Sequence, residues 1–475
     1  MASKNFTFLR PQANTVTENK LIKCMETLLQ SLDYSYIQSY SISTVPKELK
    51  KSSKDDAYLP RVVSMGPRFK GSREELMHME EIKLRCMLSL LHRVEEGKVV
   101  ESLTNCCILF CNLNEKIRAS YVADINLDDQ ELAKIMLVDG CFLLELLITK
   151  RFNDELPSHL IITTPTASQV LENEDVLSDL TLFENQIPIF IIHELCEILF
   201  PHYFKQDRNQ RAATINNLAL SIFGYSLSND QSLQGDPSHL LDVVHTFVNN
   251  KYEVCIDMDG TQSQNVNAMM ELKLKRCATT LQAAGISIQL AQEKGVTGLD
   301  FEFKFKEGKL EIGALIITKT TKAKWRNVIA WEHNRKRTSS NSNNCGKFTS
   351  AALIFNDLIC CANDVKLLKN KNIIVDYTKK SNKELEEFFN TMTLGIESGE
   401  VGSSCYGKMV DELNKYYPTT YAPIRIWNTL CHRLTYRLEW FFKFMKKDYH
   451  FVAAVISLLT VVQTVYALIA YHLPN

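Results

Sequence analysis

The stretch LFENQIPIFIIHELCEILFPHYF, residues Leu182 to Phe204, decides how this chain folds. Its long apolar run is interrupted by only three ionisable side chains, those of His193, Glu194 and Glu197. At 3.6 residues per turn the apolar positions cover nearly the whole circumference of a helix, which is typical of a helix buried in a core. The run is too short and too interrupted to cross a bilayer. It predicts a central helix that begins near Pro188, capped by Asn185 or Gln186, with other helices packed around it.

Apolar residues recur at helical spacing along most of the remaining chain. We expect further helices at residues 21–32, 74–95, 105–123, 132–148, 214–226, 239–248, 348–362, 364–368, 383–394 and 424–447. The helix at 132–148 should be capped by Asp128 or Asp129, because a side-chain oxygen there can accept a backbone N–H of the first turn. Two polar stretches, 149–179 and 249–266, are predicted to be loops, and the second is the best candidate for a disordered insertion.

Residues 299–318 follow a different pattern. LDFEFKFK, from Leu299 to Lys306, alternates apolar and charged side chains, as a strand with one buried face does. Glu307 and Gly308 form the expected turn, and LEIGALIIT, residues 310–318, is the second strand of an antiparallel hairpin. The chain is therefore expected to be mainly α, in the α+β class, with a helical body around the central helix and one small antiparallel β-element.

The segment FVAAVISLLTVVQTVYALIAYHL, Phe451 to Leu473, has 23 residues and no formal charge. At ~1.5 Å per residue, a helix of this length spans the ~30 Å hydrocarbon core of a bilayer. Flanking positive charge stays on the cytosolic side, and five basic residues precede the segment: Arg433, Arg437, Lys443, Lys446 and Lys447. We predict a single-pass C-terminal transmembrane helix in the plasma membrane or endoplasmic reticulum. The cytosolic body would comprise residues 41–447, after an N-terminal extension at 1–40.

Composition and charge limit the classes of function that this chain can have. The 54 basic and 55 acidic residues leave a net charge of −1, so the chain as a whole offers no argument for nucleic-acid binding. The N-terminus lacks the apolar core of a secretory signal, and none of the 14 cysteines forms a CxxC pair. We therefore expect reduced thiols, most of them buried.

Several ionisable positions are candidates for chemistry. Asp139 lies in an apolar helix, where a carboxylate must be paired, be hydrogen-bonded or carry a raised pKa. We expect it to pair with an arginine of a neighbouring helix, or to cap a kink, rather than to catalyse a reaction. Glu145 should point to a different face and form no acid–base pair with Asp139, and Glu184 is expected to cap the central helix. His193 with Glu194 lacks the second histidine of a zinc site, so we expect a satisfied, partly buried histidine.

Residues 319–337 interleave two tryptophans with basic side chains. Such a segment can contact anionic lipid or nucleic acid. Its expected place is nevertheless a solvated strand edge, followed by a loop rich in serine and asparagine at 338–344. The chain contains no GxGxxG, GxSxG or phosphate-loop pattern. The sequence therefore predicts no catalytic, cofactor-binding or metal-binding residue.

Several segments occur in an order that resembles one plant family. They are ISTVPKEL, AYLPRVVSMGP, HMEEIKLR, MLVDGCFLLELL, ENQIPIFIIHEL, HLLDVV, AAGISI before LDFEFKF, RNVIAWEH and FTSAALIFNDLICCANDVKLL. From about Ile42 to Leu473 the chain is similar to the domain of unknown function 247 family, also called uncharacterised protein family 0481. Gly313 departs from the pattern, because a proline often stands there. The resemblance implies a plant membrane-associated protein and supplies no established catalytic site.

We therefore expect a membrane-anchored, noncatalytic recognition or signalling protein whose partners are other proteins and not nucleic acid. Two alternatives stay open. An enzyme of unrecognised type, using Asp139, Glu184 or a cysteine, would show polar groups converging in a pocket. A binder of anionic lipid or nucleic acid through 319–337 would show a contiguous basic surface. A broad exposed apolar patch would favour the recognition protein.

Overall fold

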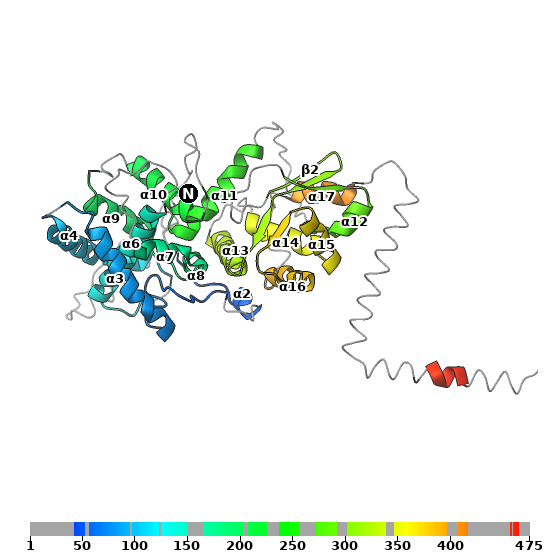
Figure 1. Ribbon diagram of the computed structural model, residues 1–475, viewed down its shortest axis with the longest axis horizontal. Helices are drawn as coiled ribbons and strands as arrows, with labels where there is room; N and C mark the ends of the chain where they lie inside the picture. Colours follow the sequence, from blue (N-terminus) through cyan, green and yellow to red (C-terminus); the bar gives the residue numbers. More distant parts are fainter. Residues whose placement is uncertain are drawn as a thin grey trace, which may run out of the picture.

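The computed structural model describes most of the body of the chain, namely residues 42–52, 57–95, 97–122, 125–150, 165–202, 208–223, 225, 237–256, 272–291, 302–338, 346–396, 406–416, 457 and 459–464. The expected extension at 1–40 and the helices expected at 21–32 and 424–447 lie outside these residues. Figure 1 shows a helical part, coloured blue to green, beside a part that contains the β-strands, coloured green to orange.

One helix, α6 (Asp129–Thr149), lies at the centre of the helical part. Every residue from Ile135 to Ile148 is buried, because nearly all of them are apolar. Asp128 caps its first turn, as expected, by accepting the N–H of Glu131 at 2.8 Å. The helices packed against it include α3 (Met77–Leu91), α4 (Val99–Asn112), α7 (Pro165–Glu172), α9 (Ile189–Leu199) and α10 (Arg208–Ile222).

The predicted central helix is α9, and it packs on one side of α6 instead of holding the centre itself. Where the two helices cross, a Cβ on Gly140 would lie 2.7 Å from Leu195 Cδ1 and 2.8 Å from Ile191 Cγ2. Glycine therefore permits the close approach. Phe190 and Ile198 remain only partly buried. The apolar circumference correctly indicated a core helix, but the longer buried run belongs to α6.

Helix α9 begins without a side-chain cap. Pro188 occupies the N-cap position, and the N–H of Ile189 donates to the carbonyl oxygen of Ser238 at 2.8 Å. The expectation that Asn185 or Gln186 caps this helix is wrong, because both side chains bond backbone groups of other segments.

The stretch 149–179, expected to be a loop, contains two short helices, α7 and α8 (Glu174–Asp179). Asn173 caps α8 by accepting the N–H of Asp175 at 3.0 Å. Helices this short hold too few apolar positions to show a helical period in the sequence.

The polar loop expected at 249–266 is helical at its start, because α11 (Leu240–Ile256) continues into it. Residues 257–266 lie outside the described part of the chain. The helix expected at 105–123 is interrupted after Asn112, and a separate helix, α5 (Asn114–Ala119), follows. Before α3, the chain forms only α2 (Lys47–Ser52) and the 3-10 turn η2 (Glu74–Leu76) within the described residues.

The predicted hairpin is present as β2 (Phe303–Lys306) and β3 (Lys309–Ile312), which pair antiparallel. Glu307 and Gly308 make the turn with φ of 50° and 76°, the left-handed pair that a two-residue hairpin favours. Residues 299–301, the expected start of the first strand, lie outside the described residues.

The predicted second strand is not continuous. After Gly313 the chain leaves the first sheet and forms β4 (Leu315–Ile317), which pairs in parallel with β5 (Ile374–Asp376). A further strand, β1 (Ser287–Leu290), pairs in parallel with β3. The expected single β-element is therefore two sheets, with the orders β1-β3-β2 and β4-β5. Parallel partners lie far apart in the chain, so local periodicity carries no information about them.

An aromatic core fills the part that contains the sheets. The ring of Phe355 lies 5.3 Å from that of Phe303, 5.5 Å from that of Phe389 and 6.0 Å from that of Trp325. The helices of this part are α12 (Ala278–Ala283), α14 (Lys347–Leu358), α15 (Ala362–Asn370), α16 (Asn382–Met392) and α17 (Gly407–Lys415).

The basic segment 319–337 is helical, and the expected strand edge is wrong. It forms α13 (Thr321–Thr338). Trp325, Arg326 and Trp331 are only 0%, 2% and 4% exposed. Figure 1 shows α13 between the helical part and the sheets, and it contacts α8 and α11 on one side and α14 and α16 on the other. Burial in this position places Arg326 inside the protein, and not on the solvated edge that was expected or on a basic surface.

The predicted membrane anchor, Phe451 to Leu473, falls mostly outside the described residues. The structure describes Ser457 and residues 459–464 of it, as exposed helix. No helix within the described ranges combines the length and the apolar character needed to cross a membrane. The anchor remains a prediction from the sequence.

Candidate functional site

Three buried carboxylates hold the N-terminal segment 42–70 against the helical part. Asp139, Asp179 and Glu184 are each at most 2% exposed, and each accepts a backbone N–H of this segment. Most of the segment's described residues lie outside helices and strands, so side chains supply partners that its backbone needs. We refer to the three residues as the buried carboxylates.

Asp139 is paired, as expected, but its partner is a lysine and not an arginine. Lys83 Nζ on α3 lies 2.7 Å from Asp139 Oδ1, and both side chains are fully buried. Asp139 Oδ2 accepts the N–H of Gly66 at 2.7 Å, while Lys83 also donates to Glu80 at 2.8 Å and to the carbonyl oxygen of Ser64. The carboxylate and the ammonium group therefore both have structural partners.

Gly66 occupies a position where no side chain fits. Its φ is +72°, and a Cβ would lie 2.8 Å from the carbonyl oxygen of Gln186 and 2.9 Å from the hydroxyl of Tyr121. That hydroxyl donates to the same carbonyl oxygen at 3.0 Å. Burial and the nearby charge of Asp139 raise the pKa of Tyr121 well above its usual value. The phenol thus keeps its proton and stays a donor.

Glu184 ties the N-terminal segment to the loop before α9. Its Oε1 accepts the N–H of Val45 at 2.6 Å and lies 2.7 Å from Lys50 Nζ, and its Oε2 lies 3.0 Å from Arg68 Nε. The expectation that Glu184 caps the central helix is wrong, because its two oxygens are occupied by these groups. Val45 precedes it by 139 residues, so no local pattern could reveal the contact.

Asp179 and Asn185 hold the next part of the segment. Asp179 accepts the N–H groups of residues 61–63 at 2.7–3.1 Å. Asn185 accepts the N–H of Met65 at 2.7 Å and donates to the carbonyl oxygen of Val63 at 3.0 Å. Burial raises the pKa of the Asp179 carboxyl to about 6, whereas the three N–H donors act in the opposite direction. The stretch ENQIP thus serves mainly as a docking surface for the N-terminal segment.

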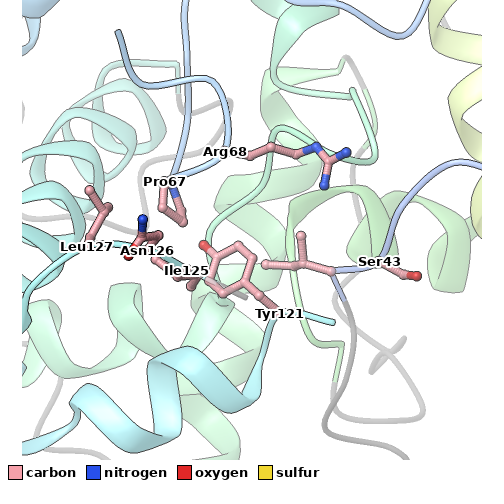
Figure 2. A pocket seen from close by; sticks show the side chains of 8 residues that line it. Ser43, Pro67, Arg68, Tyr121, Ile125, Asn126 and Leu127 are labelled. Atoms are coloured by element: carbon pink, nitrogen blue, oxygen red, sulfur yellow. The ribbon is translucent and has the colours of Figure 1, made fainter. Parts of the chain in front are cut away.

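A pocket of about 250 Å³ opens beside the docked segment. Figure 2 shows the side chains that line it, which come from residues 42–68 and 121–127: Ile42, Ser43, Pro67, Arg68, Tyr121, Ile125, Asn126 and Leu127. Its volume lies below the ~300–1,000 Å³ of typical small-molecule sites. The guanidinium of Arg68 is already paired with Glu184. The pocket therefore has room for a small polar group but not for a large cofactor.

The described residues that line the pocket do not include an acid–base pair. Catalysis by a nucleophile requires a base within hydrogen-bond reach. Among the described residues that line the pocket, none is a histidine, cysteine, aspartate or glutamate. Its hydroxyl groups belong to Ser43 and Tyr121, and Tyr121 is engaged with Gln186. The geometry of the buried carboxylates supports a structural role.

The other candidates from the sequence lie elsewhere. Glu145 pairs with Arg93 and accepts the hydroxyl of Ser89 at 3.0 Å, so it and Asp139 have different partners, as expected. His193 on α9 is partly buried, again as expected.

Polar residues of α13 join distant segments. Asn327 accepts the N–H of Phe183 at 2.9 Å and donates to the carbonyl oxygen of Ala57 at 2.8 Å. Glu332 accepts the N–H groups of residues 348–349 at 2.9 and 2.8 Å, where α14 begins. These contacts give the helix a structural role that its basic composition did not reveal.

Sequence reasoning missed one cluster, formed by Cys277, Cys360 and Asp364. Their sulfur and oxygen atoms lie within 4.8 Å of one another. Cys277 is the N-cap of α12, whereas Cys360 and Asp364 lie at the start of α15. A search for paired cysteine spacing could not find this set, because its members come from distant segments. The only local signal was the run CCANDV, which places two thiols and a carboxylate at a helix start.

Comparison with known proteins gives a family rather than an activity. A family model described as DUF247, plant protein of unknown function, matches residues 42–462. The UPF0481 protein At3g47200 of Arabidopsis thaliana is 25% identical over 376 residues, which cover 76% of this chain and 74% of that protein. The putative UPF0481 protein At3g02645, also of Arabidopsis thaliana, is 23% identical over 479 residues, covering 83% of this chain and 85% of the relative. No solved structure matches the chain.

Proposed function

Because the chain belongs to DUF247, a family of plant proteins of unknown function, we propose its function from the residues that are exposed on its own surface. The protein is a noncatalytic recognition module that binds another protein along helix α3. Residues 451–473 hold it on a membrane, with its body in the cytosol.

The observation that carries this proposal is a row of apolar side chains on the outer face of α3. Met77, Leu84 and Leu88 are 53%, 53% and 56% exposed. Positions 77, 84 and 88 fall on one face of a helix with 3.6 residues per turn, while the opposite side of α3 packs on α6. Single exposed apolar residues are ordinary on a protein surface, whereas a contiguous apolar patch marks an interaction site.

The occupant that fits this face is an amphipathic helix of a partner protein. Such a helix places apolar side chains at positions i, i+3, i+4 and i+7. The row has spacings of seven residues, from Met77 to Leu84, and four residues, from Leu84 to Leu88, with the charged Glu81 in the seven-residue gap. Glu81 and Arg85 form an exposed ion pair beside the row, with a separation of 2.6 Å, and charged residues of the partner can contact it. Helix α4, at the same end of the molecule in Figure 1, also exposes two apolar side chains, Val100 and Ile108, at 77% and 55%.

The two alternative functions have less support. A binder of anionic lipid or nucleic acid through 319–337 needs exposed basic side chains. Arg326 is buried, and Lys324 and Arg335 are partly buried. An enzyme needs a nucleophile or a base in a pocket, and the residues that line the pocket beside Arg68 supply no base.

The membrane part of the proposal is supported by the sequence. Residues 451–473 contain no formal charge, and a helix of this length matches the thickness of a bilayer. The basic residues before the segment favour a cytosolic body. Recognition would then take place at the cytosolic surface of that membrane.

Deleting residues 451–475 is expected to move the protein from the membrane fraction to the soluble fraction, because the main hydrophobic contact with the bilayer is lost. The measurement is sedimentation of plant microsomes after an alkaline carbonate wash, with the full chain as the control. Sedimentation of the truncated chain under these conditions would show that another segment is the anchor.

Replacing both Leu84 and Leu88 with aspartate is expected to abolish partner binding without unfolding the protein, because both side chains project into solvent. Proximity labelling by the full chain in plant cells measures the neighbours. Proteins that bind α3 should disappear from the labelled set, whereas neighbours in the same membrane should remain.

The matched control is Tyr377→Asp, since Tyr377 is 69% exposed but lies next to β5, in the other part of the molecule. This variant should keep the wild-type set of neighbours. An unchanged set in the α3 double variant, with an unchanged melting temperature, would refute the assignment of this face.

A further inference from the structure

Cys277 and Cys360 meet at the starts of two helices. Cys277 is the N-cap of α12, and Cys360 lies one residue before Cys361, the N-cap of α15. The sulfur atoms of Cys277 and Cys360 lie within 4.8 Å of each other, and the Cys360 thiol donates to Asp364 Oδ2 at 3.1 Å. Cys360 is partly exposed and Cys277 is 8% exposed, so a small reagent in solution can reach the pair.

Asp364 holds the two helix starts together. Its Oδ1 accepts the N–H and the hydroxyl of Thr279 at 2.8 and 2.7 Å. Its Oδ2 accepts the N–H groups of Cys360 and Cys361, each at 3.1 Å. A metal ion bound to this carboxylate would have to displace such donors. The arrangement therefore favours a bond between the two sulfur atoms over metal coordination.

The two thiols differ in protonation. The adjacent Cys360 thiol lowers the pKa of Cys277 below the usual value of a thiol, which favours the thiolate form of Cys277. Thr280 Oγ1 lies 3.2 Å from its sulfur atom and can donate to the thiolate. Contacts with Cys277 and Cys361, together with burial and the charge of Asp364, raise the pKa of Cys360. A thiolate next to a protonated thiol is the combination from which a disulfide forms.

We propose that Cys277 and Cys360 form a site of reversible oxidation, at which a hydroperoxide joins α12 to α15 through a disulfide. Cys277 Sγ attacks one peroxide oxygen, the O–O bond breaks, and the leaving oxygen takes up a proton. Cys360 then attacks the sulfenic acid at Cys277, so the S–S bond forms, the S–O bond breaks, and the Cys360 proton leaves with the hydroxyl as water. With hydrogen peroxide, the two thiols lose two electrons and two protons, and the peroxide becomes two waters. Thiol exchange with glutathione reverses the reaction.

The bridge would connect the two sheets of the structure indirectly. Helix α12 leads into β1 of the first sheet, and α15 leads into β5 of the second. A disulfide that closes a long loop stabilises the folded state chiefly by restricting the unfolded chain. Oxidation should therefore raise the melting temperature of this part of the protein.

The experiment uses the full chain in detergent, reduced with dithiothreitol and then treated with hydrogen peroxide in the presence of a metal chelator. Trypsin separates Cys277 from the peptide that contains Cys360 and Cys361. We expect these two peptides to be joined, with the loss of two hydrogen atoms. Cys360→Ser should abolish the joined peptide and leave Cys277 as a sulfenic acid that dimedone traps. Cys361→Ser, the matched control, should keep the joined peptide.

The pH dependence of alkylation tests the order of the two steps. In the wild-type chain the rate at which iodoacetamide modifies Cys277 should rise at a lower pH than for an ordinary thiol, because its pKa is lowered. A bridge that survives Cys360→Ser would overturn the proposal, as would peroxide products confined to the exposed Cys107 and Cys111 of α4. A stoichiometric metal ion that is bound before chelation and lost in Cys277→Ser would also overturn it.

Discussion

A chain that carries Arg326→Ala is expected to fail to fold. The guanidinium of Arg326 is buried and donates five hydrogen bonds of 2.9–3.1 Å, to the hydroxyl of Tyr58 and to the carbonyl oxygens of Leu49, Thr391, Met392 and Leu394. Three of these carbonyls lie at the C-terminal end of α16, where helical carbonyls lack partners within the helix. One side chain therefore joins α13, α16 and the N-terminal segment.

The size of the effect follows from the groups that would lose their partner. Each buried polar group left unsatisfied costs about 1–3 kcal/mol, and the missing side chain leaves a cavity. Four carbonyls and a hydroxyl together approach the roughly 5–15 kcal/mol by which a typical domain is stable. The measurement is the yield of soluble, cooperatively melting protein in detergent.

Two variants make this result specific. Arg326→Lys should fold but melt at a lower temperature, because an ammonium group has three donors where a guanidinium has five. Arg85→Ala removes an arginine that is 65% exposed and should leave the melting temperature unchanged. If Arg326→Ala were as stable as the wild-type protein, water would have to replace the hydrogen bonds of the guanidinium without any loss of stability.

Asp139→Asn is expected to destabilise the protein by about 1.5–3 kcal/mol, because the buried Lys83 ammonium loses one of its two charged partners and keeps only Glu80. Asparagine keeps the shape and can still accept the N–H of Gly66, but Lys83 would retain only Glu80 and the Ser64 carbonyl oxygen. Urea unfolding of the full chain in detergent measures the loss. Glu81→Gln, which breaks an exposed pair on the same helix, is the control and should have no measurable effect.

A double replacement separates the cost of the unpaired charge from the value of the pair. Asp139→Leu with Lys83→Met removes both charges, and part of the stability should return, because apolar residues can replace a buried pair, although the N–H of Gly66 then lacks its acceptor. If Asp139→Asn instead unfolds at the wild-type urea concentration and still binds its partners, while the activity of the protein in plant cells is lost, the structural interpretation is wrong and Asp139 has a catalytic role.

The parts of the fold that follow from local patterns could be predicted from the sequence. The helix around Leu195 has an apolar circumference, Asp128 stands in front of a strong helical period, and Phe303 alternates with charged neighbours up to a Glu-Gly turn. Each pattern lies within about a dozen residues, the range over which helical and strand periods act. The resemblance to the plant family also covered most of the chain that the family model matches.

The parts that depend on distant contacts could not be predicted. Glu184 looked like a helix cap because only its neighbours were visible, while its partner Val45 is 139 residues away. Arg326 looked like part of a solvated strand edge, although its carbonyl partners lie up to 277 residues away. Cys277 and Cys360 are likewise distant from each other in the sequence, so their proximity in the fold could not be predicted. A charged side chain is buried where acceptors converge on it, and that convergence is a property of the folded chain.

The docking of segment 42–70 also sets an order of events during synthesis. The segment leaves the ribosome well before its partners, because Asp179 follows Val62 by 117 residues, Glu184 follows Val45 by 139, and Arg326 follows Leu49 by 277. At roughly 5–20 residues per second, translation of those residues takes on the order of 10 s or more. During that time the segment cannot form its native contacts, and it exposes backbone groups and apolar side chains to chaperones. Completion of the helical part must therefore wait for residues that are translated late.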